Sequence, residues 1–157
     1  MSFVVDASIA GSWFLPDEAT ALTTGLALQM AERGAAAPNL IWHEVRNLLI
    51  NAWRRGRLPL VALEAQVNAL ERLPLRDAGR GDAPLVARLA REHKLTSYDA
   101  VYLAVAVTSD LPLASLDRAL RAAARAEGVA LLPRRVLTAQ KRASQSAIAS
   151  FSSCIRY

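Results

Sequence analysis

The sequence predicts an α/β fold in which a short central parallel sheet is flanked by helices. Short runs of β-favouring residues alternate with longer amphipathic stretches, as they do where crossover helices join parallel strands. The chain has 157 residues, of which 53% are hydrophobic, enough for one domain with a sizeable core. Two of the short runs are each followed by an aspartate and then a helical stretch, at Asp6 and Asp117.

Local signals justify the elements in order. A β-favouring run that begins at Phe3 predicts a buried strand over residues 2–6. Pro16 and the two acids after it predict that a helix begins there, because proline and negative charge suit a first helical turn. An apolar stripe of helical period predicts a helix over residues 40–55. The unusually apolar residues 97–109 predict a helix that is largely buried.

The complete set of elements alternates along the chain. The expected strands cover residues 2–6, 35–38, 73–75, 111–115 and 129–132. The expected helices cover residues 7–14, 16–33, 40–55, 60–72, 83–93, 97–109 and 117–127. The pattern changes from residue 134 onward, where large apolar residues become few. We therefore expect one domain over residues 1–133 and a C-terminal tail of unassigned structure over residues 134–157.

Composition narrows the class of protein. Cys154 is the single cysteine, which fits a reducing compartment, and no Cys/His cluster has the spacing of a zinc site. The apolar N-terminus lacks the positive charge of a signal peptide, and no apolar run reaches the ~20 residues that span a bilayer. We expect a soluble, cytoplasmic protein without membrane contact. The net charge of +5 favours an anionic partner such as nucleic acid or an acidic protein.

Three aspartates near predicted helix starts have two readings each. Asp6, Asp99 and Asp117 could each be a helix cap or a first-turn acid, for which aspartate is favoured. Open α/β sheets, however, bind ligands outside the carboxyl ends of their strands, and Asp6 and Asp117 both follow strands. Parallel pairing would bring these two acids to one edge. Ser8 could add a hydroxyl at the same place, or only support the turn.

Glu44 is the more informative acid. It lies three residues after Ile41 and four before Leu48, on the apolar side of its predicted helix. A glutamate that faces a core is costly unless it is paired or bound to a cation. A salt bridge to an arginine, or a place at the edge of the stripe, is the alternative explanation. Asn47 could orient Glu44 through a hydrogen bond.

A cluster of these four acids would require positive charge. Two carboxylates ~4 Å apart repel each other by ~4 kcal/mol at an effective dielectric constant of ~20. Mg²⁺ and Mn²⁺ prefer hard oxygen ligands, and Mg²⁺ commonly combines a few carboxylates with water and substrate phosphate. Such a site suits phosphoryl chemistry, because the ion activates a water molecule and neutralises charge on the scissile phosphate.

Four motifs resemble those of PIN-domain ribonucleases and, within them, of VapC-type toxins from toxin–antitoxin pairs. The motifs are FVVDASIAGSWF around Asp6, HEVRNLL around Glu44, LTSYDAVYLAVA around Asp99 and LPLASLDRAL around Asp117. They occur in the family's order and at similar separations. Ser115 stands where the family often has threonine, and the tail from residue 134 extends beyond the family's usual end.

The resemblance implies a PIN-like domain with endoribonuclease activity that depends on Mg²⁺ or Mn²⁺. Asp6, Glu44, Asp99 and Asp117 would bind the metal and position a water molecule for in-line attack on an RNA phosphodiester. The resemblance further implies a homodimer that a cognate antitoxin protein inhibits. The apolar faces of the helices expected over residues 16–33 and 60–72 would suit such a partner or a second subunit.

Two other functions compete with this interpretation. One is a catalytically inactive PIN-like module that binds RNA or protein, and the intact set of acids argues against it. The other is a Mg²⁺-dependent phosphatase, but Ser8 occupies the position where its second aspartate is expected.

Arginine clusters at residues 54–57 and along 118–125 favour either RNA backbone contact or an ordinary solvated surface. Arg118 has the strongest claim to an RNA contact, because it is next to Asp117.

Overall fold

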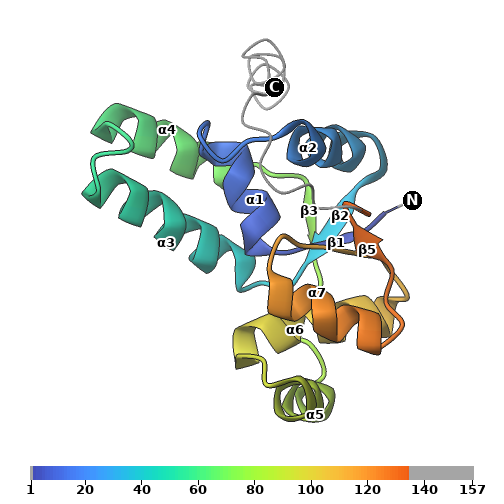
Figure 1. The fold of residues 1–157 in the computed structure, drawn as a ribbon. Helices are drawn as coiled ribbons and strands as arrows, with labels where there is room; N and C mark the ends of the chain where they lie inside the picture. Colours follow the sequence, from blue (N-terminus) through green and yellow to red (C-terminus); the bar gives the residue numbers. More distant parts are fainter. Residues whose placement is uncertain (1, 135–157) are drawn as a thin grey trace.

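The computed structural model describes residues 2–134 of the chain. In this part, five parallel strands form one sheet and seven helices flank it (Figure 1). The strands are β1 (Val4–Val5), β2 (Ala35–Ala37), β3 (Leu75–Asp77), β4 (Leu113–Ala114) and β5 (Leu131–Leu132). The helices are α1 (Ala7–Phe14), α2 (Ala21–Arg33), α3 (Ile41–Arg54), α4 (Leu60–Leu70), α5 (Ala83–His93), α6 (Ser97–Ser109) and α7 (Arg118–Ala126). The predicted α/β fold with a parallel sheet is confirmed.

The strand order β3-β2-β1-β4-β5 places β1 at the centre of the sheet. The chain first builds outward from β1 to β3, and then returns to the other side of β1 for β4 and β5. Val4 therefore pairs with Ala36 of β2 on one side and with Leu113 of β4 on the other. In open α/β sheets ligands bind where the order reverses, outside the carboxyl ends of the strands. Asp6 follows β1 at this position.

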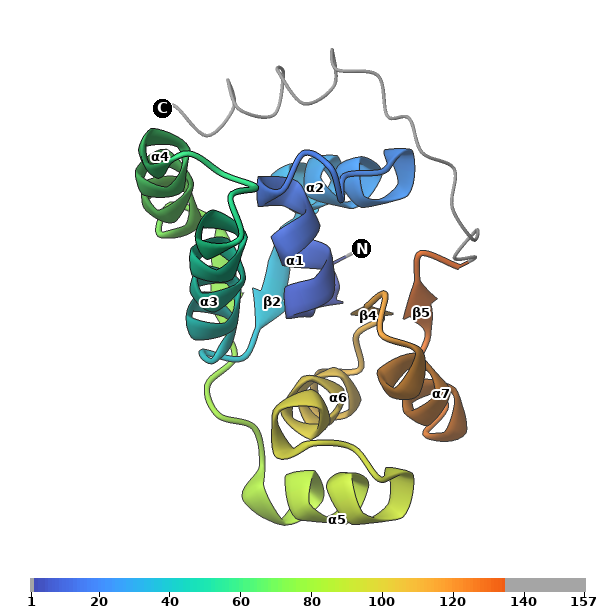
Figure 2. The same cartoon turned by 60° about the vertical axis from the view of Figure 1, so that its left-hand side comes forward.

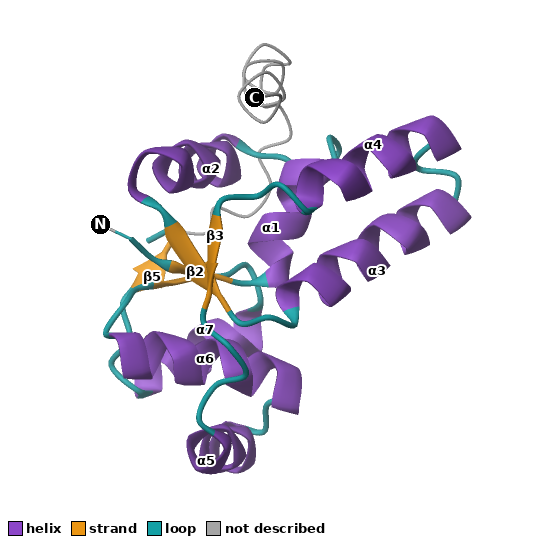
Figure 3. Ribbon diagram, turned by 180° about the vertical axis from the view of Figure 1, so that it is seen from behind, coloured by secondary structure: helices purple, strands orange, loops and turns teal. Residues whose placement is uncertain are grey.

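Helices cover both faces of the sheet. α1 and α2 lie on one face, and α6 and α7 lie on the other (Figures 1 and 3). α5 packs against the side of α6 that is turned away from the sheet (Figure 2). α3 and α4 lie side by side as a helical hairpin that extends away from the sheet. Since α6 is enclosed from two sides, seven consecutive residues from Ala100 to Ala106 are buried, and the expectation of a buried helix is confirmed.

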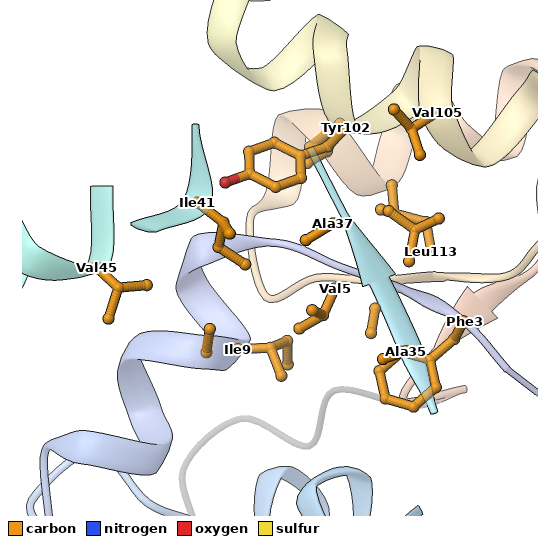
Figure 4. Close-up of a cluster of buried hydrophobic side chains, with 14 of the residues drawn as sticks. Phe3, Val5, Ile9, Ala35, Ala37, Ile41, Val45, Tyr102, Val105 and Leu113 are labelled. Carbon is orange, nitrogen blue, oxygen red and sulfur yellow. The ribbon is translucent and has the colours of Figure 1, made fainter. Parts of the chain in front are cut away.

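The core joins the sheet to the helices of both faces. One buried cluster includes Phe3, just before β1, and Val5 of β1. It also includes Ile9 of α1, Ile41 of α3 and Val105 of α6 (Figure 4). All five side chains are at most 2% exposed. Burial of one such side chain contributes roughly 1.5–3 kcal/mol. The first residues of α1 and α3 are thereby fixed against the sheet, and these helices carry or adjoin two of the predicted site acids.

The start of α2 and the position of β3 differ from the predictions, and several other elements are one or two residues shorter at an end than predicted. α2 begins at Ala21 rather than at residue 16, because Thr20 and Thr23 form a capping box in which each side chain accepts the other's backbone N–H. The acids after Pro16 instead pair with Arg57. β3 covers Leu75–Asp77 rather than residues 73–75, because these three residues pair with β2.

No helix within residues 2–134 is long and apolar enough to cross a membrane. The predicted tail over residues 134–157 lies outside the described residues, apart from Arg134.

Candidate functional site

Asp6 is both a helix cap and a deeply buried carboxylate. It is the N-cap of α1, where Oδ1 accepts the backbone N–H of Ile9 at 3.0 Å and the hydroxyl of Ser8 at 2.7 Å. Oδ2 accepts the hydroxyl of Ser115 at 2.5 Å. The residue is only 3% exposed, and burial raises the pKa of its carboxyl to about 6 against these hydrogen bonds. Burial therefore dominates the electrostatics of Asp6.

Two serine hydroxyls connect Asp6 to the segment that follows β4. Ser115 Oγ accepts the backbone N–H of Asp117 at 3.0 Å, and Ser8 Oγ accepts that of Leu116 at 2.9 Å. Each hydroxyl thus donates to Asp6 and accepts from the backbone beyond β4. The carboxyl ends of β1 and β4, far apart in sequence, are held together around one carboxylate.

Glu44 lies in the first turn of α3 and is half-buried. Its Oε2 accepts a hydrogen bond from the hydroxyl of Tyr102, on α6, at 2.5 Å. Burial raises the pKa of Glu44, the hydrogen bond from Tyr102 opposes this, and the negative charges of Asp99 and Asp6 raise the pKa further. Glu44 therefore lies close enough to both Asp6 and Asp99 to be repelled by their charges.

Asp99 lies in the first turn of α6 but is not its cap. Thr96 is the N-cap: its hydroxyl oxygen accepts the backbone N–H of Asp99 at 3.1 Å and donates to Asp99 Oδ2 at 2.7 Å. Asp99 is one helical turn before Tyr102, so both side chains lie on the same face of α6. The carboxylate thus keeps an oxygen that Thr96 does not bind.

Asp117 is the exposed N-cap of α7. Its Oδ1 accepts the backbone N–H of Leu120 at 2.7 Å, and its own N–H connects it to Asp6 through Ser115. Arg118 is exposed beside it. The structure therefore gathers Asp6, Glu44 and Asp99 at the carboxyl ends of the strands and holds Asp117 at their rim.

Several supporting residues lie differently from the expectations. Asn47 is exposed, and within residues 2–134 no hydrogen bond joins it to Glu44, whose partner is Tyr102. Arg57 pairs with acids of the α1–α2 connection, and Arg121 is 4% exposed, so neither belongs to a free basic surface.

Sequence reasoning missed Tyr102. It is the one hydroxyl-bearing residue in the buried stretch of α6, and a buried tyrosine hydroxyl usually has a partner. This polar group in an apolar helix, one turn after Asp99, was the signal that could have identified it.

The four acids lack positive partners within the described part of the chain. None of the ion pairs there involves Asp6, Glu44, Asp99 or Asp117. Their carboxylate oxygens, next to two serine hydroxyls, form the hard donor set that Mg²⁺ and Mn²⁺ prefer. No three of these acids bring ligand atoms within 4.8 Å of one another, so an ion would be bound partly through water, as is common for Mg²⁺.

A second group of residues does bring its ligand atoms within 4.8 Å of one another. It lies where α5 contacts the end of α7 and consists of Glu92, His93 and Glu127. Arg88 already supplies their positive charge, because it donates to Glu92 at 2.7 Å and to Glu127 at 2.8 Å. His93 Nε2 is 2.7 Å from Glu127 Oε1. Arg88, followed by His93, lowers the pKa of Glu127 to about 2. We interpret this group as an ion-pair network that joins two helices.

Comparisons with known proteins agree with the fold. The family model of the PIN domain matches residues 3–126, which include all four acids. The crystal structure of PAE2754 from Pyrobaculum aerophilum aligns with 98% of this chain and 90% of that chain, at 23% sequence identity and a TM-score of 0.63. At this identity the likeness concerns the fold alone. None of the curated proteins compared with the chain matches it.

Proposed function

Because this chain belongs to the PIN domain family, whose members are generally nucleases, we propose that it is a metal-dependent endoribonuclease. The observation that carries the proposal is the convergence of Asp6, Glu44 and Asp99, whose charges have no ion-pair partner among the described residues. Three carboxylates without ion-pair partners at the reversal point of a parallel sheet favour cation binding.

In this proposal the acids hold Mg²⁺ or Mn²⁺ and orient a water molecule toward an RNA phosphodiester. Asp6, Glu44 and Asp99 bind the ion, with Asp117 at the rim as a further ligand. When bound, the ion supplies a nucleophilic water and neutralises charge on the phosphate. Ser8, Ser115 and Tyr102 fix the carboxylate oxygens through the hydrogen bonds described above.

Arg118 is proposed to contact the RNA backbone. Its side chain is exposed at the first residue of α7, next to Asp117. Arginine donates to phosphate oxygens in a planar fork and adds to affinity without reading sequence. Replacement of Arg118 should therefore weaken RNA binding at low salt more than at high salt.

The proposed biological role is the toxin of a type II toxin–antitoxin pair, inhibited by a cognate antitoxin and assembled as a homodimer. Exposed large apolar side chains on α2 and α4 support a protein partner. They include Leu22, Leu28, Leu60 and Val61, the last of which is 78% exposed. Light scattering of the full chain, alone and with the antitoxin, tests this role, and a monomer that binds no antitoxin contradicts it.

RNA cleavage by the purified full chain tests the enzymatic proposal. Wild type should cleave RNA with Mg²⁺ or Mn²⁺ and stop in EDTA. Asp6→Asn removes the charge and keeps a side chain able to cap α1, so it should fold and lose at least ~100-fold in rate.

Asp110→Asn is the matched control for this experiment. It makes the same chemical change at an exposed residue that ends α6, and asparagine tolerates its left-handed conformation. It should cleave like wild type. Undiminished cleavage in EDTA or by Asp6→Asn would refute the proposed mechanism. RNA binding without cleavage would favour the inactive binding module.

A further inference from the structure

Arg121 is a buried arginine outside the set of acids. It lies in α7 with 4% exposure, and its guanidinium donates to three backbone carbonyls. Nη1 donates to the carbonyl of Ser115 at 2.7 Å and to that of Leu132 at 3.0 Å, and Nη2 donates to that of Pro133 at 2.9 Å. These carbonyls lie at the carboxyl ends of β4 and β5. No ion pair within residues 2–134 includes Arg121.

Backbone hydrogen bonding explains part of the reason for an arginine at this position. A methionine of similar volume would avoid the cost of burying a charge, but it would leave the carbonyls of Ser115 and Pro133 without the donor that Arg121 supplies. The neighbouring residues Leu120, Ala123 and Ala124 are buried and apolar. The planar fork of arginine has a geometric property that methionine lacks, because it fixes several acceptors relative to one another.

The peptide unit between Ser115 and Leu116 connects Arg121 to Asp6. Its carbonyl accepts from Arg121, and its N–H donates to the hydroxyl of Ser8, which donates to Asp6 Oδ1. The side chain of Ser115 donates to Asp6 Oδ2. Both oxygens of the Asp6 carboxylate are thus held by serine hydroxyls on or bonded to one peptide unit. Arg121 binds the carbonyl of that peptide unit.

We propose that Arg121 is a positioning residue of the active site, which orients the Ser115–Leu116 peptide so that two serine hydroxyls fix both oxygens of Asp6. The predicted effect on metal binding rests on the proposed function. The orientation of the Ser115–Leu116 peptide by Arg121 does not depend on it. Substitutions in the residues that orient metal ligands commonly weaken metal binding 10- to 100-fold. Arg121 acts through Ser115 and Ser8 and touches neither metal nor substrate.

Mn²⁺ titration of the metal-free full chain, followed by the paramagnetic resonance signal of free Mn²⁺, tests the consequence. Arg121→Met should bind Mn²⁺ about 10-fold more weakly than wild type. Arg121→Lys should lie between them, because an ammonium lacks the planar fork. Arg125→Met, an exposed arginine of the same helix, should bind like wild type. Unchanged affinity in Arg121→Met would overturn the inference.

A double-mutant cycle separates positioning from general loosening. If Arg121 acts through Ser115, then Arg121→Met in the Ser115→Ala background should cost little further Mn²⁺ affinity. Full additivity of the two losses would contradict the proposed route.

Amide hydrogen exchange gives a readout that needs neither metal nor RNA. The amides of Leu116 and Asp117, which donate to the two serine hydroxyls, should exchange faster in Arg121→Lys than in Arg125→Lys. Equal exchange would overturn the inference, even if Arg121→Met fails to fold. A wild type that binds Mn²⁺ but leaves RNA intact would contradict the proposed function, while the exchange data would still decide the role of Arg121.

Discussion

Asp6 is a structural carboxylate whose burial bears on its proposed role in metal binding. One oxygen caps α1, and burial raises the pKa of the carboxyl to about 6. Near neutral pH the ionised form is therefore held in surroundings that disfavour it. A cation would relieve this cost, so the same burial that weakens the metal-free fold would strengthen metal binding.

The first prediction concerns the stability of the metal-free protein as a function of pH. The pKa of Asp6 is about 6 in the folded state against an ordinary value of 3.8, so the folded state binds the proton more tightly. Its contribution to stability is most favourable below pH ~4 and is lost as the pH rises to ~6, by on the order of 3 kcal/mol. Urea unfolding of wild type and Asp6→Asn in EDTA should give a stability difference that changes by this amount.

Asp110→Asn, which makes the same chemical change at an exposed residue, is the control in this measurement. A stability difference for Asp6→Asn that does not change with pH would contradict the raised pKa of the Asp6 carboxyl.

Tyr102→Phe is expected to move the acid limb of the pH–rate profile. The tyrosine hydroxyl lowers the pKa of Glu44, so without it the pKa rises further and the ionised form requires a higher pH. RNA cleavage should therefore fall below wild type on the acid limb of the profile and recover toward wild type as the pH rises. Tyr98→Phe is the matched control, because Tyr98 is 65% exposed one turn earlier on α6. A uniform loss at all pH values would contradict the electrostatic role of Tyr102.

At this scale the places of the acids in their helices could be predicted from the sequence, but their hydrogen-bond partners could not. The sequence alone shows that an acid stands just before a predicted helix or in its first turn. It does not show hydrogen bonds such as that from Tyr102 to Glu44, which joins residues 58 apart in the chain. Asn47 illustrates the limit of helical spacing. The buried stripe of α3 consists of Ile41, Val45, Leu49 and Ala52. Glu44 lies at its edge, whereas Asn47 falls on the far side and faces solvent.

At the scale of elements, a close approach of α1 to α3 brings Asp6 and Glu44 near each other. Gly11 is buried in this contact, and a Cβ there would come within 2.8 Å of Leu48 Cδ1. Glycine therefore lets the two helices pack more closely than alanine would without movement of Leu48. Because α1 begins at the Asp6 cap and α3 carries Glu44 in its first turn, their spacing also sets the width of the site.

The third prediction tests where α2 begins. Thr20→Ala removes one half of the capping box and should destabilise the protein by about 1 kcal/mol, measured by urea unfolding. Thr24→Ala, four residues on in the same helix, should change stability much less. A larger effect from changes at Pro16 than at Thr20 would instead support a helix that starts earlier.

The bounds of a helix could be predicted where a capping residue stood directly before the stretch of helical hydrophobic pattern. α1, α5 and α6 have the predicted bounds, because each follows an acid or threonine cap. The start of α2 was misplaced, because proline and acids also suit the turn that precedes it. The strands are two or three residues long, too short for an alternating pattern to mark their ends, and their extent depends on pairing with neighbours.

At the scale of the whole molecule, the sheet order makes the site possible. The sequence predicted parallel strands and a shared edge for Asp6 and Asp117, but not that β1 lies between β2 and β4. That order follows from the packing of α1 and α6 on opposite faces, which depends on contacts between distant segments. With β1 central, acids from both halves of the chain reach one place.

The fourth prediction follows for the stability of the whole domain. Because Mn²⁺ binds the folded state, it should stabilise the domain at pH 7 by about 2.7 kcal/mol at 100 times its Kd and thereby raise the unfolding midpoint. At pH 5 protons compete for Asp6, so the affinity should fall about 10-fold and the stabilisation at the same Mn²⁺ concentration to roughly half. Thermal unfolding with and without Mn²⁺ measures it. An equal rise in Asp6→Asn would place the binding ion elsewhere, for example at Glu92, His93 and Glu127.

The bond between Asp6 and Ser115 spans 109 positions of the chain. During synthesis the aspartate leaves the ribosome among the first residues, whereas the serine that fixes it is made only after six of the seven described helices. A nascent or truncated chain therefore contains most of the acids but not their arrangement. If the protein cuts RNA, a chain that ends before Ser115 should therefore be inactive, because Asp6 lacks the hydroxyl that holds its Oδ2.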